Sequence, residues 1–82
     1  MDELKIEHLK GLCVIEAIKY LMQKQNISHE DAYKKLLSTD IYNILMNSDS
    51  DMFLENDDYI KKALDLELSN NKAAMYEFIK AS

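Results

Sequence analysis

The sequence predicts an all-α fold, a compact bundle of four to five short helices around a long N-terminal helix. Chain breakers are almost absent, because the 82 residues include no proline and one glycine. Apolar residues recur at helical spacing throughout the chain, whereas the alternation typical of β-strands is missing. We therefore expect one helical domain that covers residues 1–82.

The long helix is expected over residues 3–25, where the apolar arc is wider than a usual amphipathic stripe. This arc contains Ile6, Leu9, Cys13, Val14, Ala17, Ile18, Tyr20 and Leu21. An arc of this width indicates a central helix that is covered from several sides. Leu12 falls among the polar positions, and with Ile15 it could form part of a dimer contact.

Capping residues place the shorter helices. Asn26 can end the first helix in a left-handed conformation, and Ser28 can begin a second helix over residues 29–37. A third helix near 40–46 follows Ser38 or Thr39.

The second half of the chain predicts two more helices. Asn56 can cap a fourth helix over residues 57–68, while the apolar triplet 52–54 before it is too short to classify. A last helix over about 71–80 could pack on its own chain, exchange with a partner or fray, so residues 70–82 are a peripheral or exchanged element.

Negative charge is concentrated in the middle of the chain. Residues 1–35 carry six acids and six lysines, and residues 61–82 carry three acids and four lysines. Residues 36–60 carry no base and six carboxylates, namely Asp40, Asp49, Asp51, Glu55, Asp57 and Asp58. The middle segment therefore accounts for the net charge of −5 and predicts attraction to a basic surface.

Aromatic and methionine side chains accompany these acids. We expect an exposed, adaptable patch of Tyr42, Met46, Met52 and Phe53, edged by Asp49, Asp51, Asp57 and Asp58. Such side chains are common at protein-binding surfaces. The alternative is that the tyrosines lie at the edge of the core with their rings buried and their hydroxyls in water.

The same acidic stretch has part of the pattern of a calcium loop. Oxygen-bearing side chains fall at suitable positions of a twelve-residue loop, at Asn47, Asp49, Asp51, Glu55 and Asp58. However, Met52 stands where the loop needs glycine, and Asp58 is too short for the usual bidentate contact. A turn followed by a helix cap explains the same residues, and a divalent-cation module stays an alternative.

A DNA-binding regulator is the other alternative, because residues 29–46 have the outline of a helix-turn-helix. Its second helix would dock within the acidic segment, where the phosphate backbone would be repelled. We therefore do not expect nucleic acid as the partner.

Nothing in the sequence indicates catalysis or a cofactor. Cys13 lies between Leu12 and Val14 within a helix, where a buried cysteine is inert. His8 and His29 are not placed beside it by any pattern, and one glycine cannot form a phosphate-binding loop. We therefore expect a protein that is not an enzyme.

Size and composition also bear on assembly and compartment. A domain of this length has a marginal core, so we expect a homodimer. The lone cysteine indicates the cytoplasm, and no apolar run is long enough for a membrane span.

Several helix-cap and core residues resemble small uncharacterised bacterial proteins of all-helical type. The second helix has the pattern I-S-x-x-x-A-Y-x-x-L over residues 27–36, and the resemblance extends through Leu37, Ile41, Tyr42, Ile44, Leu45, Tyr59 and Ile60. Some members are encoded beside proteins of ADP-ribosyltransferase-like fold that are suspected of being toxins. The resemblance implies an accessory or antitoxin-like role and assigns no site residue.

We therefore expect a non-enzymatic protein–protein interaction module that engages a basic partner through its acidic middle segment.

Overall fold

The computed structural model describes residues 2–81, which form five α-helices and one short 3-10 helix and contain no strand. In chain order the elements are α1 (Glu3–Gln25), α2 (His29–Leu37), α3 (Asp40–Met46), η1 (Met52–Leu54), α4 (Asp57–Leu68) and α5 (Lys72–Lys80). The predicted all-α fold and the long first helix are confirmed. The predicted helix bounds agree with the observed ones to within a residue.

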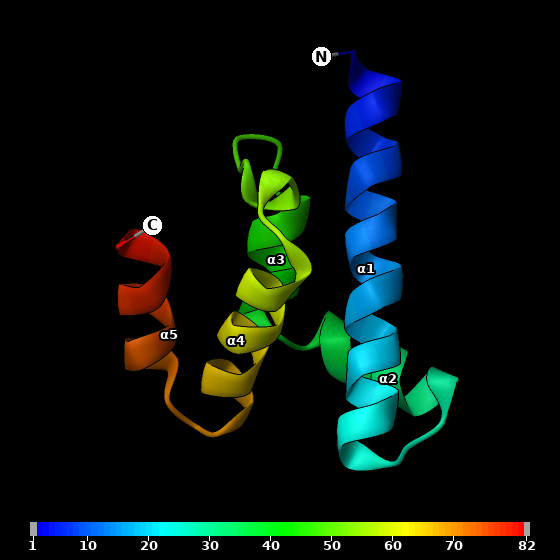
Figure 1. Cartoon of the computed structure of the whole chain (residues 1–82), viewed down its shortest axis with the longest axis vertical. Helices are drawn as coiled ribbons and strands as arrows, with labels where there is room; N and C mark the ends of the chain where they lie inside the picture. Colours follow the sequence, from blue (N-terminus) through cyan, green and yellow to red (C-terminus); the bar gives the residue numbers. More distant parts are fainter. Residues whose placement is uncertain (1, 82) are drawn as a thin grey trace.

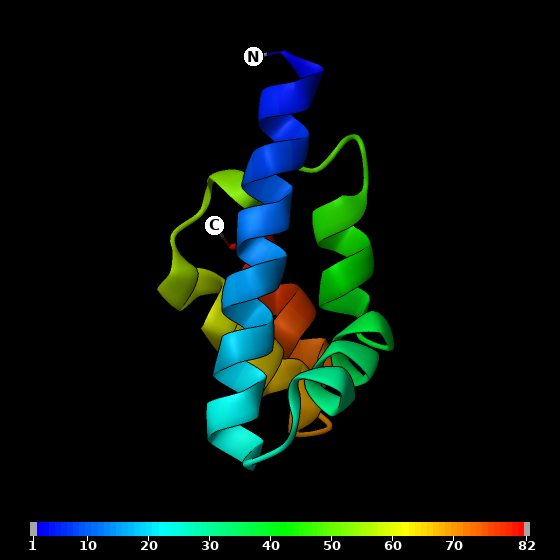
Figure 2. The ribbon, with the colours of Figure 1, turned by 90° about the vertical axis from the view of Figure 1, so that its right-hand side faces the viewer.

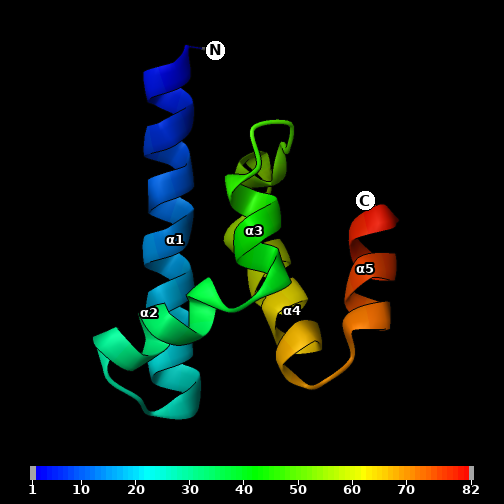
Figure 3. The ribbon, with the colours of Figure 1, turned by 180° about the vertical axis from the view of Figure 1, so that it is seen from behind.

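The helices are arranged around the pair formed by α3 and α4. Figure 1 shows α1 on one side of this pair and α5 on the other. Seen from behind in Figure 3, α2 crosses the C-terminal half of α1. The first turns of α1 extend beyond the other helices in both views, so this part of α1 has few neighbours.

The predicted caps begin three of the helices. The side chains of Ser28, Thr39 and Asn56 each accept a hydrogen bond from the backbone amide three residues later, at 2.9–3.2 Å. Asn26 ends α1 with φ of 52° and ψ of 51°, which is the left-handed conformation expected there. Local side chains therefore set most of the helix boundaries.

All the helices contribute to one core. Its fully buried large side chains come from α1 to α5: Leu21, Leu36, Ile41, Leu45, Leu64 and Met75. Met75 connects α5 to this core, and the rings of Tyr59 and Phe78 lie 4.9 Å apart between α4 and α5. The last helix therefore packs on its own chain.

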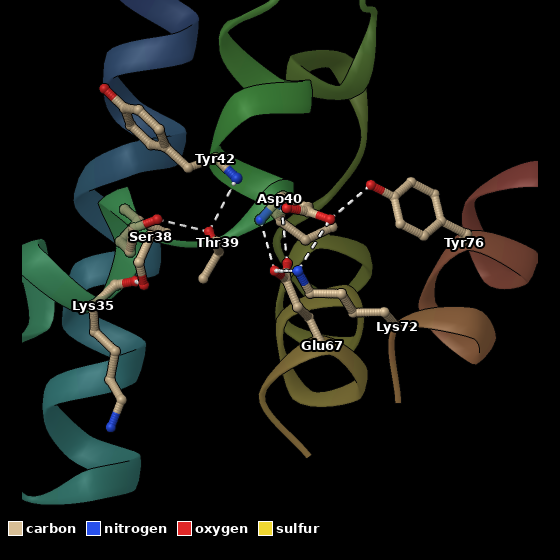
Figure 4. A network of polar contacts seen from close by, with 10 residues as sticks. Lys35, Ser38, Thr39, Asp40, Tyr42, Glu67, Lys72 and Tyr76 are labelled. Atoms are coloured by element: carbon tan, nitrogen blue, oxygen red, sulfur yellow. Dashed lines mark hydrogen bonds and ion pairs between the residues drawn. The ribbon is translucent and has the colours of Figure 1, made fainter. Parts of the chain in front are cut away.

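A buried carboxylate fixes the start of α3. Glu67 of α4 accepts hydrogen bonds from the amides of Asp40 at 2.6 Å and Ile41 at 3.0 Å, and its side chain is only 4% exposed. Figure 4 shows Asp40 turned the other way, toward α5. There it accepts a hydrogen bond from the Tyr76 hydroxyl at 2.8 Å and lies 3.3 Å from the ammonium of Lys72. These contacts join α3, α4 and α5.

Replacing Glu67 by alanine should lower the free energy of unfolding by about 3 kcal/mol, because two buried amides lose a charged acceptor. Glu67→Gln retains one carbonyl oxygen and should cost less. Urea denaturation followed by circular dichroism measures both changes. Glu77→Ala on the exposed face of α5 is the control, and should change stability by no more than about 0.5 kcal/mol. A loss no larger in Glu67→Ala than in this control would contradict the assigned role.

Candidate functional site

The acidic segment after α3 is an ordered turn held by its own side chains. Asn47 accepts a hydrogen bond from the amide of Asp49 at 2.8 Å, and Ser50 accepts one from the amide of Met52 at 3.2 Å. The carboxylates of Asp49 and Asp51 are exposed. These are the local side-chain-to-backbone bonds typical of Asn and Ser in turns.

Two members of the expected binding patch are not available to a partner. Met52 and Phe53 form η1 and are only 6% and 9% exposed, because both pack into the core. The expectation that they are exposed is therefore wrong. Met46 is exposed, as expected, and Tyr42 is half-buried against the core. The apolar triplet 52–54 is too short to show a helical or strand period, so the direction of its side chains could not be predicted from the sequence.

The acidic residues do not form one continuous surface. Figure 2 shows the turn that follows α3 and the first turn of α4 on opposite sides of α1. Asp49 therefore lies apart from Asp57 and Asp58, which are exposed in that first turn of α4. Adjacent acidic stretches in the sequence have become two separate groups.

A groove lies between the N-terminal turns of α1 and the C-terminal end of α3. It has a volume of about 600 Å³ and is lined by Glu3, Ile6, Glu7, Lys10, Met46 and Ser48. We call it the α1–α3 groove. Apolar side chains come from both helices, while Glu3 and Glu7 are exposed one helical turn apart on α1. The exposed acidic turn continues directly from Ser48.

The one lysine in this groove is engaged within the protein. The ammonium of Lys10 donates a hydrogen bond to the carbonyl oxygen of Asn47 at 3.0 Å and lies 5.6 Å from the centre of the Phe53 ring. It therefore caps the C-terminal end of α3, where the helix dipole favours a cation. Only 7% of Lys10 is exposed, whereas the charged side chains Glu3 and Glu7 in the groove lining are exposed.

Among the described residues, one acid of the middle segment forms an ion pair. Asp40 is paired with Lys72, which belongs to the C-terminal part of the chain. Within residues 2–81, the structure describes no ion pair for Asp49, Asp51, Glu55, Asp57 or Asp58, nor for Glu3 and Glu7. The carboxylates at the groove and on the turn therefore have no ion-pair partner among the described residues.

A second polar cluster joins α1 to α4 near the opposite end of α1. Asp65 accepts hydrogen bonds from the hydroxyl of Tyr20 at 2.6 Å and from the ammonium of Lys24 at 2.7 Å. Burial alone would raise the pKa of Asp65, but these two donors outweigh it and hold the pKa below its usual value. The donors Tyr20 and Lys24 and the acceptor Asp65 satisfy one another, which indicates that this cluster has a structural role.

The single cysteine and the two histidines lie in different environments. Cys13 is buried, and its thiol lies 3.8 Å from the carbonyl oxygen of Phe53. Burial, with a smaller contribution from the Asp57 charge, raises the pKa of this thiol and disfavours the reactive thiolate. His8 and His29 are both exposed. In the described part of the chain, no three His, Cys, Asp or Glu side chains are grouped closely enough to hold a metal ion.

The start of α3, within the region that has the outline of a helix-turn-helix, packs against other helices. In a helix-turn-helix, the N-terminal residues of the second helix approach the bases. Here that end of α3 is covered by Glu67 of α4 and Tyr76 of α5. The start of α3 is therefore in contact with both α4 and α5.

No protein-family model, curated protein or solved structure matches this chain. None of the helices in residues 2–81 has the length and apolarity needed to span a membrane.

Sequence reasoning missed the contribution of α1 to the candidate site. Glu3 and Glu7 are balanced by lysines in a count over residues 1–35, so they did not stand out as part of the acidic character. Their i, i+4 spacing on the same side of α1 as Ile6 was the available signal. That Met46 would meet this face depends on contacts between residues about 40 positions apart, which no local pattern contains.

The paired aspartates should make the fold less stable in acid. The hydroxyl of Tyr76 and the ammonium of Lys72 lower the pKa of Asp40, so the folded state binds this proton less readily than the unfolded state. This stabilisation is complete above the unfolded pKa of about 3.9 and is lost as the pH falls through the folded value. Asp65 contributes in the same direction.

Urea titrations between pH 7 and pH 2 test this. Asp40→Asn and Tyr76→Phe should each lower the free energy of unfolding at pH 7. They should also reduce its fall at low pH, because each removes part of the interaction that shifts the pKa of Asp40. If the free energy of unfolding of Asp40→Asn falls as steeply at low pH as that of the unmodified chain, the stabilising role of Asp40 is contradicted.

Proposed function

We propose that this protein is a non-enzymatic binding module that engages a basic protein segment at the α1–α3 groove. The observation that supports this proposal is a groove with Ile6 and Met46 in its lining whose rim carboxylates, Glu3 and Glu7, form no ion pair within residues 2–81. The acidic middle segment contributes Asp49 and Asp51, from the turn beside the groove.

The groove favours an amphipathic ligand. Methionine is flexible and adapts to different apolar side chains, so Met46 and Ile6 can accept a leucine or phenylalanine from a partner. Lysine or arginine residues on either side of that apolar residue would meet Glu3 and Glu7 on one rim and the acidic turn on the other. Asp57 and Asp58 belong to the first turn of α4 and do not line this groove.

An accessory or antitoxin-like role agrees with this surface. Covering a positively charged nucleotide or nucleic-acid site of another protein is one way in which an acidic groove could inhibit it. The proposed setting is the cytoplasm of a bacterium, where a lone free cysteine is chemically compatible with the reducing conditions. The small core also favours self-association, so we propose a homodimer.

A synthetic amphipathic helix made of leucine and lysine is a direct probe. Binding measured by fluorescence anisotropy should weaken about fivefold in the double variant Glu3→Gln, Glu7→Gln, because two exposed charge pairs are worth about 0.2–1 kcal/mol each. Raising the salt from 0.05 to 0.5 M should weaken binding by the unmodified chain more than by this variant. Met46→Ala should weaken binding at every salt concentration, because it removes apolar contact.

Asp57→Asn, Asp58→Asn is the matched control, since it removes two charges from the other side of α1. It should reduce the affinity for the peptide much less than the groove variant does. Equal losses in the two double variants would show that only net charge matters and would overturn the proposed site.

A further inference from the structure

Helix α1 has a second apolar face that no other part of the described chain covers. Leu4, Leu12 and Ile15 are 79%, 45% and 49% exposed. Gly11 lies among them, and a Cβ placed there would meet nothing within 4 Å. Neither φ nor crowding within the protein therefore requires the only glycine of the chain, although glycine disfavours the middle of a helix. A close approach by another helix would explain it.

The spacing of this face is that of a coiled-coil seam. Leu4, His8, Gly11 and Ile15 are separated by four, three and four residues, and all four are exposed. The next two seam positions, Ile18 and Met22, belong to the core or pack against it. The free seam is therefore limited to residues 4–15, about 18 Å of helix. It includes the turns of α1 that extend beyond the other helices (Figure 1).

We propose that this seam pairs antiparallel with the same seam of a second copy, which names the surface of the self-association proposed above. In an antiparallel pair, Leu4 lies opposite Ile15 of the second copy, and His8 lies opposite Gly11 of the second copy. The imidazole then fills the space that the missing side chain leaves. Each of these two residue pairs occurs twice in the dimer, because the two-fold axis passes between the two His8–Gly11 pairs.

Charge on the edge of the seam favours the same direction. Lys5 and Glu16 lie on the same flank of the seam, near its two ends. Antiparallel pairing places Lys5 opposite Glu16 of the second copy, and the symmetry repeats the pair. Glu16 lies 3.7 Å from Lys19 in the same chain, a solvent-exposed contact that is weak and easily exchanged.

A parallel pair has neither of these advantages. It would place glycine against glycine and leave a gap, and it would bring the two His8 side chains together in the next layer. Lys5 and Glu16 of the second copy would then be eleven residues apart along the helix axis, too far to pair. The seam residues are also distinct from those that line the α1–α3 groove, so each surface can be altered separately.

Sedimentation velocity over a range of protein concentrations tests the pairing. The unmodified chain should show a reversible monomer–dimer equilibrium, and Ile15→Asp should raise the dissociation constant at least tenfold. Leu54→Asp is the matched control, because Leu54 is an exposed leucine (59%) of η1 and not a seam residue, so this variant should leave association unchanged. A monomer at every concentration would overturn both this pairing and the self-association proposed above. A dimer that Ile15→Asp leaves intact would overturn this surface alone.

Cross-linking determines the direction. Leu4→Cys mixed with Ile15→Cys should form a disulfide-linked dimer under mild oxidation, much faster than either variant alone. Faster cross-linking of each variant with itself would indicate a parallel pair and overturn the proposed register.

Gly11→Ala separates the effect of the glycine on helix stability from its effect on the approach of a second helix. It should raise the melting temperature of the dilute monomer and weaken the dimer severalfold. Unchanged association in this variant would contradict close approach at Gly11. Binding of the leucine–lysine peptide should persist in Ile15→Asp, which keeps this test independent of the groove.

Discussion

The hydrogen bonds between Glu67 and the first amides of α3 are the constraint on which the rest of the structure depends. A helix of seven residues is not stable alone, and the amides at its start need acceptors. A carboxylate buried in α4 is equally costly without donors. Each group satisfies the other, so α3 can lie only where its N-terminus meets Glu67. Asp40 then points toward Lys72 and Tyr76, which ties α5 to the same point (Figure 4).

Both ends of α3 are held by charged side chains from other helices. An anion, Glu67, meets the positive end of the helix dipole, and a cation, Lys10, meets the negative end. Lys10 also lines the α1–α3 groove, but its ammonium donates to a backbone carbonyl and forms no described ion pair with a rim carboxylate. The electrostatics that position α3 therefore also leave Glu3 and Glu7 available to a partner. The contact of Lys10 with the end of α3 thus affects both the position of α3 and the charge of the candidate site.

Helix α1 separates two kinds of contact. The side that faces α3 carries Ile6 and the rim carboxylates of the groove, and it packs into the core further along the helix. The seam at Leu4 and Ile15 faces solvent and contains a glycine that the monomer does not need. A long helix whose first turns extend beyond its neighbours can make contacts within its own chain and with a second copy, because the two faces do not overlap. The apolar arc read from the sequence described only the side that packs within the chain.

The sequence by itself determined the helices of this protein, because their signals are local. Ser28, Thr39, Asn56 and Asn26 act on amides and carbonyls within four residues. Helical spacing placed Ala17, Ile18 and Leu21 on the apolar arc of the first helix, and all three are buried. Only the tertiary structure decided which acids are free and where they gather. The contacts of Glu67 with α3 and of Lys10 with Asn47 join residues 26 to 37 positions apart, and the burial of Phe53 depends on packing against α1. Pairing across such distances depends on how the helices pack, which no local pattern of residues contains.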